Sequence, residues 1–200
     1  MNMMSKAIDV FNAGGIIIYP TDTAFGMGCR IDRIDAVKRL FSLRRRPETQ
    51  AVPVLVAGIE MAEKYLATPL SNNVRHLMEK YWPGGLTIVY PCKVDITPPL
   101  VRGGGTTLGV RMPDHELALE LIKEVGVPIL GPSANFHGFK TPYDLSDLDP
   151  ELTKLVDFVV TGETKTKNSS TVIDCSKSTW KILRQGSIKI NFIDKGESHI

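Results

Sequence analysis

Cysteine is scarce in this sequence, and its placement excludes two common kinds of site. The three cysteines are Cys29, Cys92 and Cys175, which are widely separated and form no Cys-x-x-Cys pair. Zinc sites and disulfide frameworks need closely or regularly spaced cysteines, so neither is expected here. We expect all three thiols to be reduced and to pack as small apolar side chains.

The common signatures of hydrolases and nucleotide-binding folds are also absent. The four histidines are scattered, and none lies in a His-Glu-x-x-His pattern or beside a serine nucleophile motif. This distribution argues against zinc hydrolases and serine hydrolases. No P-loop pattern and no Gly-x-Gly-x-x-Gly fingerprint occurs, so neither usual phosphate-binding loop is available. No metal ligand set is predicted.

Long hydrophobic runs and a strong charge of one sign are missing as well. Ile16–Tyr19 is one of the longest apolar stretches, far short of the roughly 20 residues of a membrane helix. The first residues show no basic segment followed by an apolar one, so we expect a cytoplasmic protein without a membrane anchor. The net charge of +2 does not indicate general nucleic-acid binding, although Arg44–Arg46 forms a local basic site.

What the sequence does contain is an alternation of strand-like and helix-like segments, typical of an α/β fold. We predict a single domain over residues 1–188 with an open, twisted, mixed β-sheet flanked by helices, and a loose tail over 189–200. Residues 21–29 are expected to be a loop, and Asp32 or Asp35 to cap a helix that ends near Arg46–Pro47. The expected helices cover 5–13, 34–46, 59–66, 71–81 and 116–125, and the expected strands 16–19, 52–56, 86–90, 108–111, 128–130, 157–160, 171–174 and 180–183.

Hydroxyls, glycines and arginines gather where several of these strands end. In an open α/β sheet, ligands bind beside strand ends where loops converge, and arginines there can hold phosphates with two hydrogen bonds. Each segment alone also fits a structural role: the threonines as turn residues, the arginines as a helix end, and the Ser-x-Asn stretch as a helix cap. The segments are 20–23, 44–47, 132–135, 170–172 and 184–186.

The order of these segments carries more information than any one of them. The stretches YPTDTAFGMG, FSLRRRP, YWPGGLTIVYP, TTLGVRMPDH, GPSANFHG, SSTVIDCS and ILRQGSI follow one another between about Gly14 and Ile188. In this order and at these spacings the chain resembles the YrdC/TsaC family of threonylcarbamoyl-AMP synthases, in a short, single-domain form.

The resemblance implies a nucleotidyltransferase. It would condense L-threonine, bicarbonate or CO₂, and ATP into threonylcarbamoyl-AMP and pyrophosphate, with Mg²⁺ accompanying ATP. The product would feed a threonylcarbamoyl transferase complex that modifies the adenosine next to the tRNA anticodon. A direct contact with tRNA or double-stranded RNA is left open. Such a reaction needs aligned anions and positive charge more than covalent help from the protein.

The same resemblance assigns roles to individual residues. Arg44 and Arg46 match a Lys-x-Arg motif that contacts the phosphates, Arg111 matches an arginine that pairs with the threonine carboxylate, and Ser133 and Asn135 match a Ser-x-Asn motif. The implied sets are Arg44 and Arg46 for catalysis; Thr21, Thr23, Arg111 and Ser170 for threonine; and Arg46, Thr107, Ser133, Asn135 and Arg184 for ATP.

Three positions depart from the family pattern. Arg44 stands where lysine is usual, which keeps the charge but replaces a point donor by a planar fork. Phe25 replaces a frequent tyrosine and removes a hydroxyl. Gln50 stands where the family often has a polar or basic residue. These departures keep open a diverged relative that binds RNA or a nucleotide without making the adenylate. A carbamoyl-transfer module of a hydrogenase-maturation protein is disfavoured, because the zinc fingers expected beside it are missing.

Overall fold

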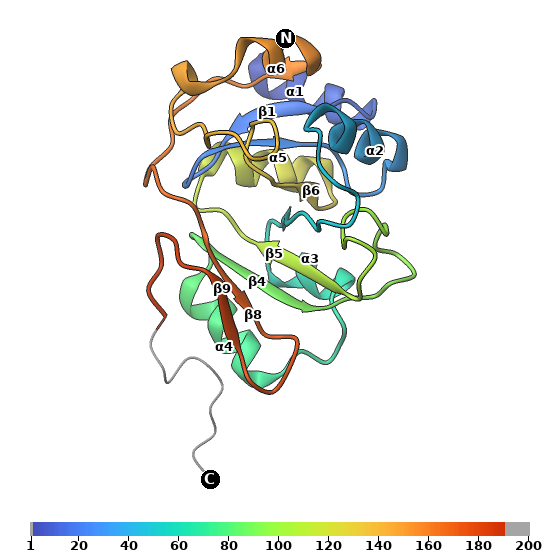
Figure 1. Cartoon of the computed structure of the whole chain (residues 1–200), viewed down its shortest axis with the longest axis vertical. Helices are drawn as coiled ribbons and strands as arrows, with labels where there is room; N and C mark the ends of the chain where they lie inside the picture. Colours follow the sequence, from blue (N-terminus) through green and yellow to red (C-terminus); the bar gives the residue numbers. More distant parts are fainter. Residues whose placement is uncertain (1, 191–200) are drawn as a thin grey trace.

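The computed structural model describes residues 2–190, and the strands of this part form two sheets (Figure 1). Residues 191–200 of the predicted tail lie outside the described residues. Of its first two residues, Lys189 is exposed and Ile190 is buried against the core. The strands are β1 Ile17–Pro20, β2 Phe25–Gly28, β3 Val54–Leu55, β4 Leu86–Pro91, β5 Thr107–Arg111, β6 Ile129–Leu130, β7 Phe158–Val159, β8 Thr171–Asp174 and β9 Lys181–Arg184.

The smaller sheet has the order β2-β1-β7, with β1 antiparallel to β2 and parallel to β7. The prediction that 21–29 is entirely loop was wrong, because β2 lies within it. Its two glycines are needed for close packing: a Cβ on Gly26 would meet the Tyr19 ring, and one on Gly28 would collide with the Leu130 carbonyl. Glycine in a strand often marks such a close approach of another backbone.

The larger sheet has the order β6-β3-β5-β4-β8-β9. Its β3/β5 and β4/β8 pairs are parallel and the other pairs are antiparallel, so the sheet is mixed, as predicted. Short bridges join the two sheets, from Gly26 to Ser133 and from Arg30 to Ile129. The open α/β domain expected from the sequence is therefore confirmed, with its strands divided between two sheets.

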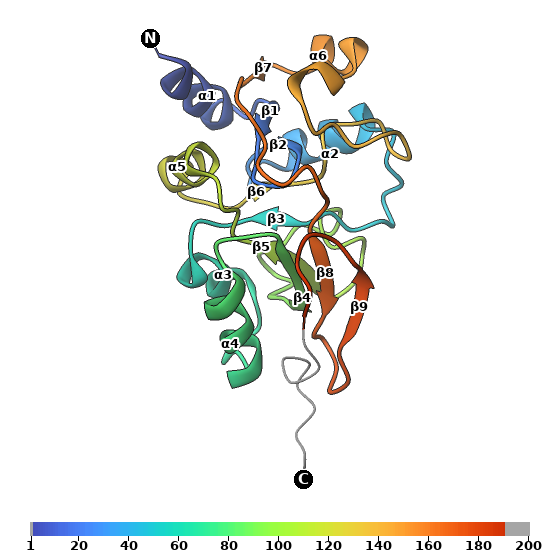
Figure 2. The same ribbon diagram turned by 90° about the vertical axis from the view of Figure 1, so that its left-hand side faces the viewer.

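Helices cover both sheets. Figure 2 shows α1 and α5 on one side of the smaller sheet, α2 and α6 on its other side, and α3 and α4 against the larger sheet. Apolar residues of α1, α5 and β1 share one buried cluster. The helices are α1 Met3–Asn12, α2 Ile34–Leu43, α3 Ile59–Tyr65, α4 Asn72–Tyr81, α5 Glu116–Val125 and α6 Pro150–Leu155, with a 3₁₀ turn η1 at Leu145–Asp147.

Helix α2 differs from its prediction at both ends. Neither Asp32 nor Asp35 caps it, because Arg33 occupies the N-cap position without a side-chain bond and Asp32 instead pairs with Arg30. The helix stops at Leu43, three residues earlier than expected. Arg45 has a φ of 53°, a left-handed conformation that ends helices. This turn sets the directions of the arginines on either side of it.

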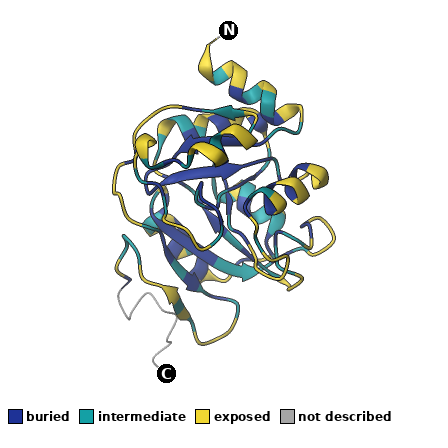
Figure 3. Cartoon of the chain, turned by 45° about the horizontal axis from the view of Figure 1, so that its top comes forward, coloured by how far each residue is buried: buried dark blue, intermediate teal, exposed yellow. Residues whose placement is uncertain are grey.

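The core runs through both sheets (Figure 3). The three cysteines are free and buried within it, as the sequence predicted. No helix within residues 2–190 is long and apolar enough to cross a membrane.

Candidate functional site

One cavity gathers loops from both sheets. It holds about 700 Å³ of empty space, a figure that includes its open mouth. Most of the residues predicted from the sequence line it, although they come from segments far apart in the chain. The predicted residues on its wall are Thr21, Thr23, Arg44, Arg46, Arg111, Ser133, Ser170 and Arg184.

The turn after β1 supplies the two threonines. Thr21 Oγ1 donates to the Ala24 carbonyl at 2.7 Å and lies 3.1 Å from Thr23 Oγ1. It also accepts from the main-chain nitrogens of Thr23 and Ala24. Thr21 therefore closes the β1–β2 turn, which is the structural role that its sequence position also allowed. The Thr23 hydroxyl has fewer structural bonds, and both side chains are buried.

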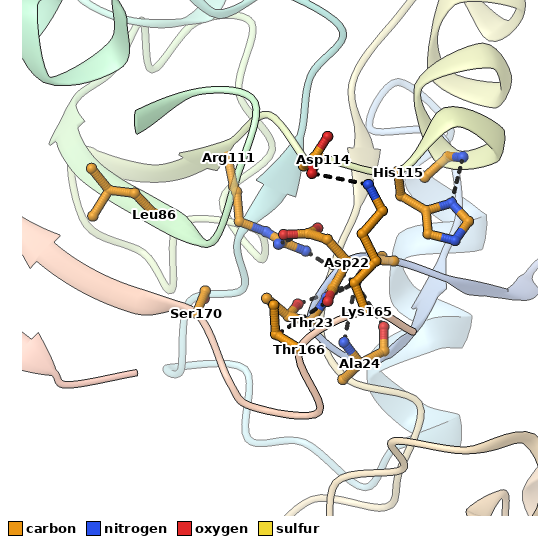
Figure 4. A network of polar contacts seen from close by, with 12 residues as sticks. Asp22, Thr23, Ala24, Leu86, Arg111, Asp114, His115, Lys165, Thr166 and Ser170 are labelled. Carbon is orange, nitrogen blue, oxygen red and sulfur yellow. Dashed lines mark hydrogen bonds and ion pairs between the residues drawn. The ribbon is translucent and has the colours of Figure 1, made fainter. Parts of the chain in front are cut away.

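Arg111, at the end of β5, forms a buried ion pair with Asp22. Figure 4 shows its guanidinium reaching the carboxylate, with Nη1 2.9 Å from Oδ1. Its Nη2 donates to Thr21 Oγ1 at 3.3 Å. The side chains of Arg111 and Asp22 are 6% and 4% exposed, so water screens this pair little. The pair holds Arg111 in one orientation at the cavity wall.

Arg44 is a buried cation without a carboxylate partner in the described part of the chain. Its Nε and Nη2 donate to the main-chain and side-chain oxygens of Asn135 at 3.0 and 3.2 Å, and its Nη1 is buried with no acceptor. Burial, together with the nearby charge of Arg46, lowers the pKa of Arg44 to about 10. A buried, uncompensated charge is costly to fold, so this nitrogen is suited to receive an anion.

Arg46 and Arg184 add two further positive charges. Arg46 donates to the carbonyls of Gln50 and Ala51, and burial lowers its pKa. Arg184 donates to Ser170 O at 3.0 Å and to Ser170 Oγ at 2.9 Å. Burial and, secondarily, the charge of Arg111 lower the pKa of Arg184. Arg46 and Arg184 take part in no ion pair within residues 2–190, so the cavity carries a surplus of positive charge.

Arg45 lies between the two cavity arginines in sequence but outside the cavity in space. Its guanidinium is 4.7 Å from the centre of the Phe136 ring, a cation–π contact. The left-handed turn at Arg45 thus lets Arg44 and Arg46 both reach the cavity wall. Two of the three arginines in the basic run, Arg44 and Arg46, therefore line the cavity.

Two predicted residues do not line the cavity. Thr107 begins β5 and Arg111 ends it, so the two lie roughly 13 Å apart at about 3.3 Å per residue. Asn135 is buried behind the wall, where its Oδ1 accepts from Arg44 and from Ser133 Oγ at 2.6 Å. Asn135 therefore orients wall residues, and a role for it in direct contact with ATP stays a prediction, as does that of Thr107.

Sequence reasoning missed four polar residues around the cavity. Thr87 lies within the apolar strand β4 and its Oγ1 is 2.9 Å from Ser170 Oγ. Thr141 and Ser169 lie on loops of the wall, and Asp22 pairs with Arg111 as described. The available signals were the position of Asp22 between two predicted threonines and a hydroxyl at Thr87 in an otherwise apolar run, since a buried hydroxyl needs a partner.

The arrangement suits anion binding better than hydrolysis. Ser133 Oγ donates to an amide oxygen and no histidine contacts it in the described chain, so it has no general base. No group of three or more His, Cys, Asp or Glu residues within 2–190 could hold a metal ion. Arginines and hydroxyls can bind carboxylates and phosphates through charge-assisted hydrogen bonds.

Comparisons with known proteins show what the chain is similar to. Residues 9–186 match the family model Sua5_yciO_yrdC, described as "Telomere recombination". The Threonylcarbamoyl-AMP synthase of Bacillus subtilis is 36% identical over 92% of this chain, which spans about half (54%) of that protein's length. The synthase of Photobacterium profundum is 31% identical over 93% of this chain and its whole length is covered. A structure of Pyrococcus abyssi Sua5 complexed with L-threonine superposes with a TM-score of 0.87 at 31% identity, covering 98% of this chain and 58% of that one.

Proposed function

Because the chain belongs to the Sua5/YciO/YrdC family, we propose that it makes threonylcarbamoyl-AMP from L-threonine, bicarbonate or CO₂, and ATP. The observation that carries the proposal is the pairing of two different arginine environments in one cavity. Arg111 is ion-paired and lies among hydroxyls, whereas Arg44 is buried with a free nitrogen. The first environment suits a single carboxylate and the second suits phosphate.

The reaction consists of two bond-forming steps. The neutral amine of threonine attacks the carbon of CO₂ and releases a proton, which gives a carbamate. A carbamate oxygen then attacks the α-phosphorus of ATP, and the bond between that phosphorus and the bridging oxygen of the β-phosphate breaks. Pyrophosphate leaves with the electron pair. Negative charge gathers on the transferring group in this step, so fixed positive charges accelerate it.

The residues of the cavity divide these tasks. On the threonine side, Arg111 would pair with the substrate carboxylate, and Thr21, Thr23 and Ser170 would bind its polar groups. The likeness to a relative solved with L-threonine supports threonine as the amino acid. Holding amine and phosphate in line supplies the alignment that the reaction needs.

On the ATP side, Arg44 and Arg46 would neutralise the phosphates, and Arg184 and Ser133 would add donors. Mg²⁺ would arrive bound to ATP as part of the substrate, because the described residues offer phosphate-binding arginines but no carboxylate cluster for a resident ion. Magnesium bound through substrate phosphates and water needs few protein ligands.

We also propose the cellular setting that the family implies. The adenylate would pass in the cytoplasm to a threonylcarbamoyl transferase complex that modifies tRNA. A direct contact with tRNA or double-stranded RNA would then depend on surface lysines and arginines and would weaken with added salt. Filter binding of tRNA between 50 and 200 mM salt measures that contact separately from catalysis.

The test is threonine-dependent release of pyrophosphate from Mg-ATP and bicarbonate by the purified protein. We expect release to require all three substrates and to fall by about 10²-fold in Arg46→Ala, comparable to the loss of one preorganised donor. Tight binding of nucleotide or RNA without any threonine-dependent release would instead support the diverged binding protein.

A further inference from the structure

Asp22 is the one carboxylate that pairs with a cavity arginine within residues 2–190. Its Oδ1 lies 2.9 Å from Arg111 Nη1, and its side chain is 4% exposed. The other three arginines on the wall are in no ion pair within that range. The cavity therefore has one arginine whose charge is balanced and three whose charges are not.

The main chain of Asp22 is anchored by three hydrogen bonds. The Asp22 carbonyl accepts hydrogen bonds from Lys165 N at 3.1 Å, Thr166 N at 2.8 Å and Thr166 Oγ1 at 3.1 Å. These bonds attach the segment that leads to Ser169 and Ser170 on the cavity wall. Figure 4 shows Asp22 between Arg111 and this segment. The carboxylate is thus held at the junction of two parts of the wall.

The two proposed substrates place different charges in this cavity. Threonine presents one carboxylate, whereas ATP presents a polyphosphate with several negative charges. When one carboxylate joins the Arg111–Asp22 pair, the net charge of the three groups is only −1. A polyphosphate in the same place would bring several negative charges close to the Asp22 anion. The three unbalanced arginines carry three positive charges and match a polyphosphate.

On the basis of the function proposed above, we propose that Asp22 is a positioning and specificity-determining residue that reserves Arg111 for the substrate carboxylate. It does so in two ways. Its ion pair orients the Arg111 guanidinium, and its negative charge directs polyphosphate to Arg44, Arg46 and Arg184. Specificity of this kind comes from a repulsive element placed against the wrong ligand.

The substitution Asp22→Asn removes the charge and keeps a side chain of the same shape. We expect it to raise the KM for threonine at least ten-fold while the KM for ATP stays the same or falls. Inorganic tripolyphosphate should compete only with ATP in the wild type but with both ATP and threonine in Asp22→Asn. Asp22→Glu, which restores the charge, should restore the wild-type inhibition pattern.

Asp114→Asn is the matched control. Asp114 also forms a 2.9 Å ion pair, with Lys165, but both side chains are 54% exposed. We expect this variant to keep both KM values within two-fold and to leave the tripolyphosphate pattern unchanged. A merely structural role for Asp22 would lower the melting temperature of Asp22→Asn without separating the two KM values, and this would overturn the proposal.

Calorimetry on the wild type keeps the proposal testable if Asp22→Asn does not fold. Threonine affinity should change by less than two-fold when tripolyphosphate saturates the protein, because the two bind to separate arginines. Mutual exclusion would overturn the role of Asp22 even if turnover is normal. Simultaneous binding without threonine-dependent pyrophosphate release would leave the role of Asp22 standing and overturn the proposed reaction.

Discussion

Arg44 and Asn135, 91 positions apart in the sequence, are joined by two hydrogen bonds. Arg44 Nε donates to the main-chain oxygen of Asn135 at 3.0 Å, and Nη2 donates to its side-chain oxygen at 3.2 Å. Asn135 in turn donates to the Phe139 carbonyl at 2.6 Å and accepts from Ser133. The asparagine therefore connects the end of α2 with the loop after β6 and holds the arginine in its buried position.

This relationship predicts that Asn135 acts through Arg44. We expect Asn135→Ala to lower kcat/KM by about ten-fold, less than removal of a direct donor, because the arginine keeps its charge and its bond to the main chain. Pyrophosphate release measures the effect. If Asn135 instead contacts ATP directly, Asn135→Ala should lose activity additively in the background of Arg44→Ala, whereas coupled residues give a smaller loss in the double variant.

The sequence predicts best those features that depend on local patterns. Helix α5 has the predicted bounds Glu116–Val125, because its apolar residues recur at helical spacing and Gly126, with a φ of 76°, ends it. Strand β2 escaped prediction, since its two glycines indicate a loop when the Tyr19 ring and the Leu130 carbonyl that they accommodate are unknown.

Prediction of the site was limited in the same way, because it depends on contacts between distant parts of the chain. Thr21, Thr23 and the four predicted arginines line the cavity, whereas Thr107 does not. Asn135 was assigned to ATP, which stays a prediction, whereas its hydrogen bonds to Arg44 and to the Phe139 carbonyl were not foreseen. Asp22 was passed over because nothing in the local sequence reveals that Arg111, 89 positions away, is its partner. Long-range polar pairing is the information that a single sequence does not contain.

The contacts of Asp157 lead us to predict that the stability of the folded protein depends on pH. It accepts from Ile16 N at 2.7 Å and pairs with Arg39, and the Arg39 hydrogen bond holds the pKa of Asp157 below its usual value of 3.8. A carboxyl with a lowered folded-state pKa contributes stability above its unfolded pKa and loses it as pH falls through the folded pKa. We expect Asp157→Asn to cost about 1 kcal/mol at pH 7, since the pair is partly exposed.

Thermal melts at pH 7 and at successively lower pH measure this effect, and the difference between wild type and Asp157→Asn should shrink below pH 4. Glu151→Gln is the control, because its pair with Lys154 is exposed on both sides and should contribute less than 0.5 kcal/mol. A difference that stays constant down to pH 2 would mean that the carboxyl charge plays no part.

We predict that the three cysteines of the folded protein react slowly with thiol reagents. Cys29 is fully buried, and burial raises its pKa to about 12. Burial also raises the pKa of Cys175 and of Cys92, of which Cys92 is the less buried. Because the thiolate is the reactive form, we expect a thiol-specific disulfide reagent at pH 8 to modify the native protein slowly and all three thiols after unfolding. Cys92, the most exposed of the three at 8%, should react first, and Cys92→Ser should remove that phase. Rapid modification of the native Cys92→Ser variant would contradict the burial argument.

Substrate choice tests the threonine side of the cavity. Thr21 Oγ1 is already bonded within the β1–β2 turn, so the buried Thr23 hydroxyl, 3.1 Å from it, is the group of the two with capacity left to bond a substrate hydroxyl, and valine cannot make that bond. We expect serine to lose about 10- to 200-fold in kcat/KM through its missing methyl group and valine to lose on the order of 10⁴-fold. Thr23→Val should narrow the difference between threonine and valine. Equal turnover of the two amino acids by the wild type would remove both threonines from the pocket.

Arg44 is the residue at which activity and stability should move in opposite directions. We expect Arg44→Lys to keep most of the activity, because positive charge is what the transfer step needs, and Arg44→Met to lose about 10²-fold. Without phosphates, Arg44→Met should melt at or above the wild-type temperature, because a buried charge with an unpaired nitrogen has been replaced by an apolar side chain.

Adding tripolyphosphate separates the two consequences of this charge. A ligand that binds only the folded protein stabilises it, so tripolyphosphate should raise the melting temperature of wild type and Arg44→Lys and affect Arg44→Met little. The measurements are the rate of pyrophosphate release and the melting temperature of the three proteins, compared side by side. Indistinguishable rates would mean that Arg44 only ends a helix, and equal stabilisation of all three would mean that polyphosphate binds elsewhere. If Arg44→Lys is faster than the wild type, the site depends on a compact ammonium rather than on a planar fork, and Arg44 marks a chain whose chemistry has diverged.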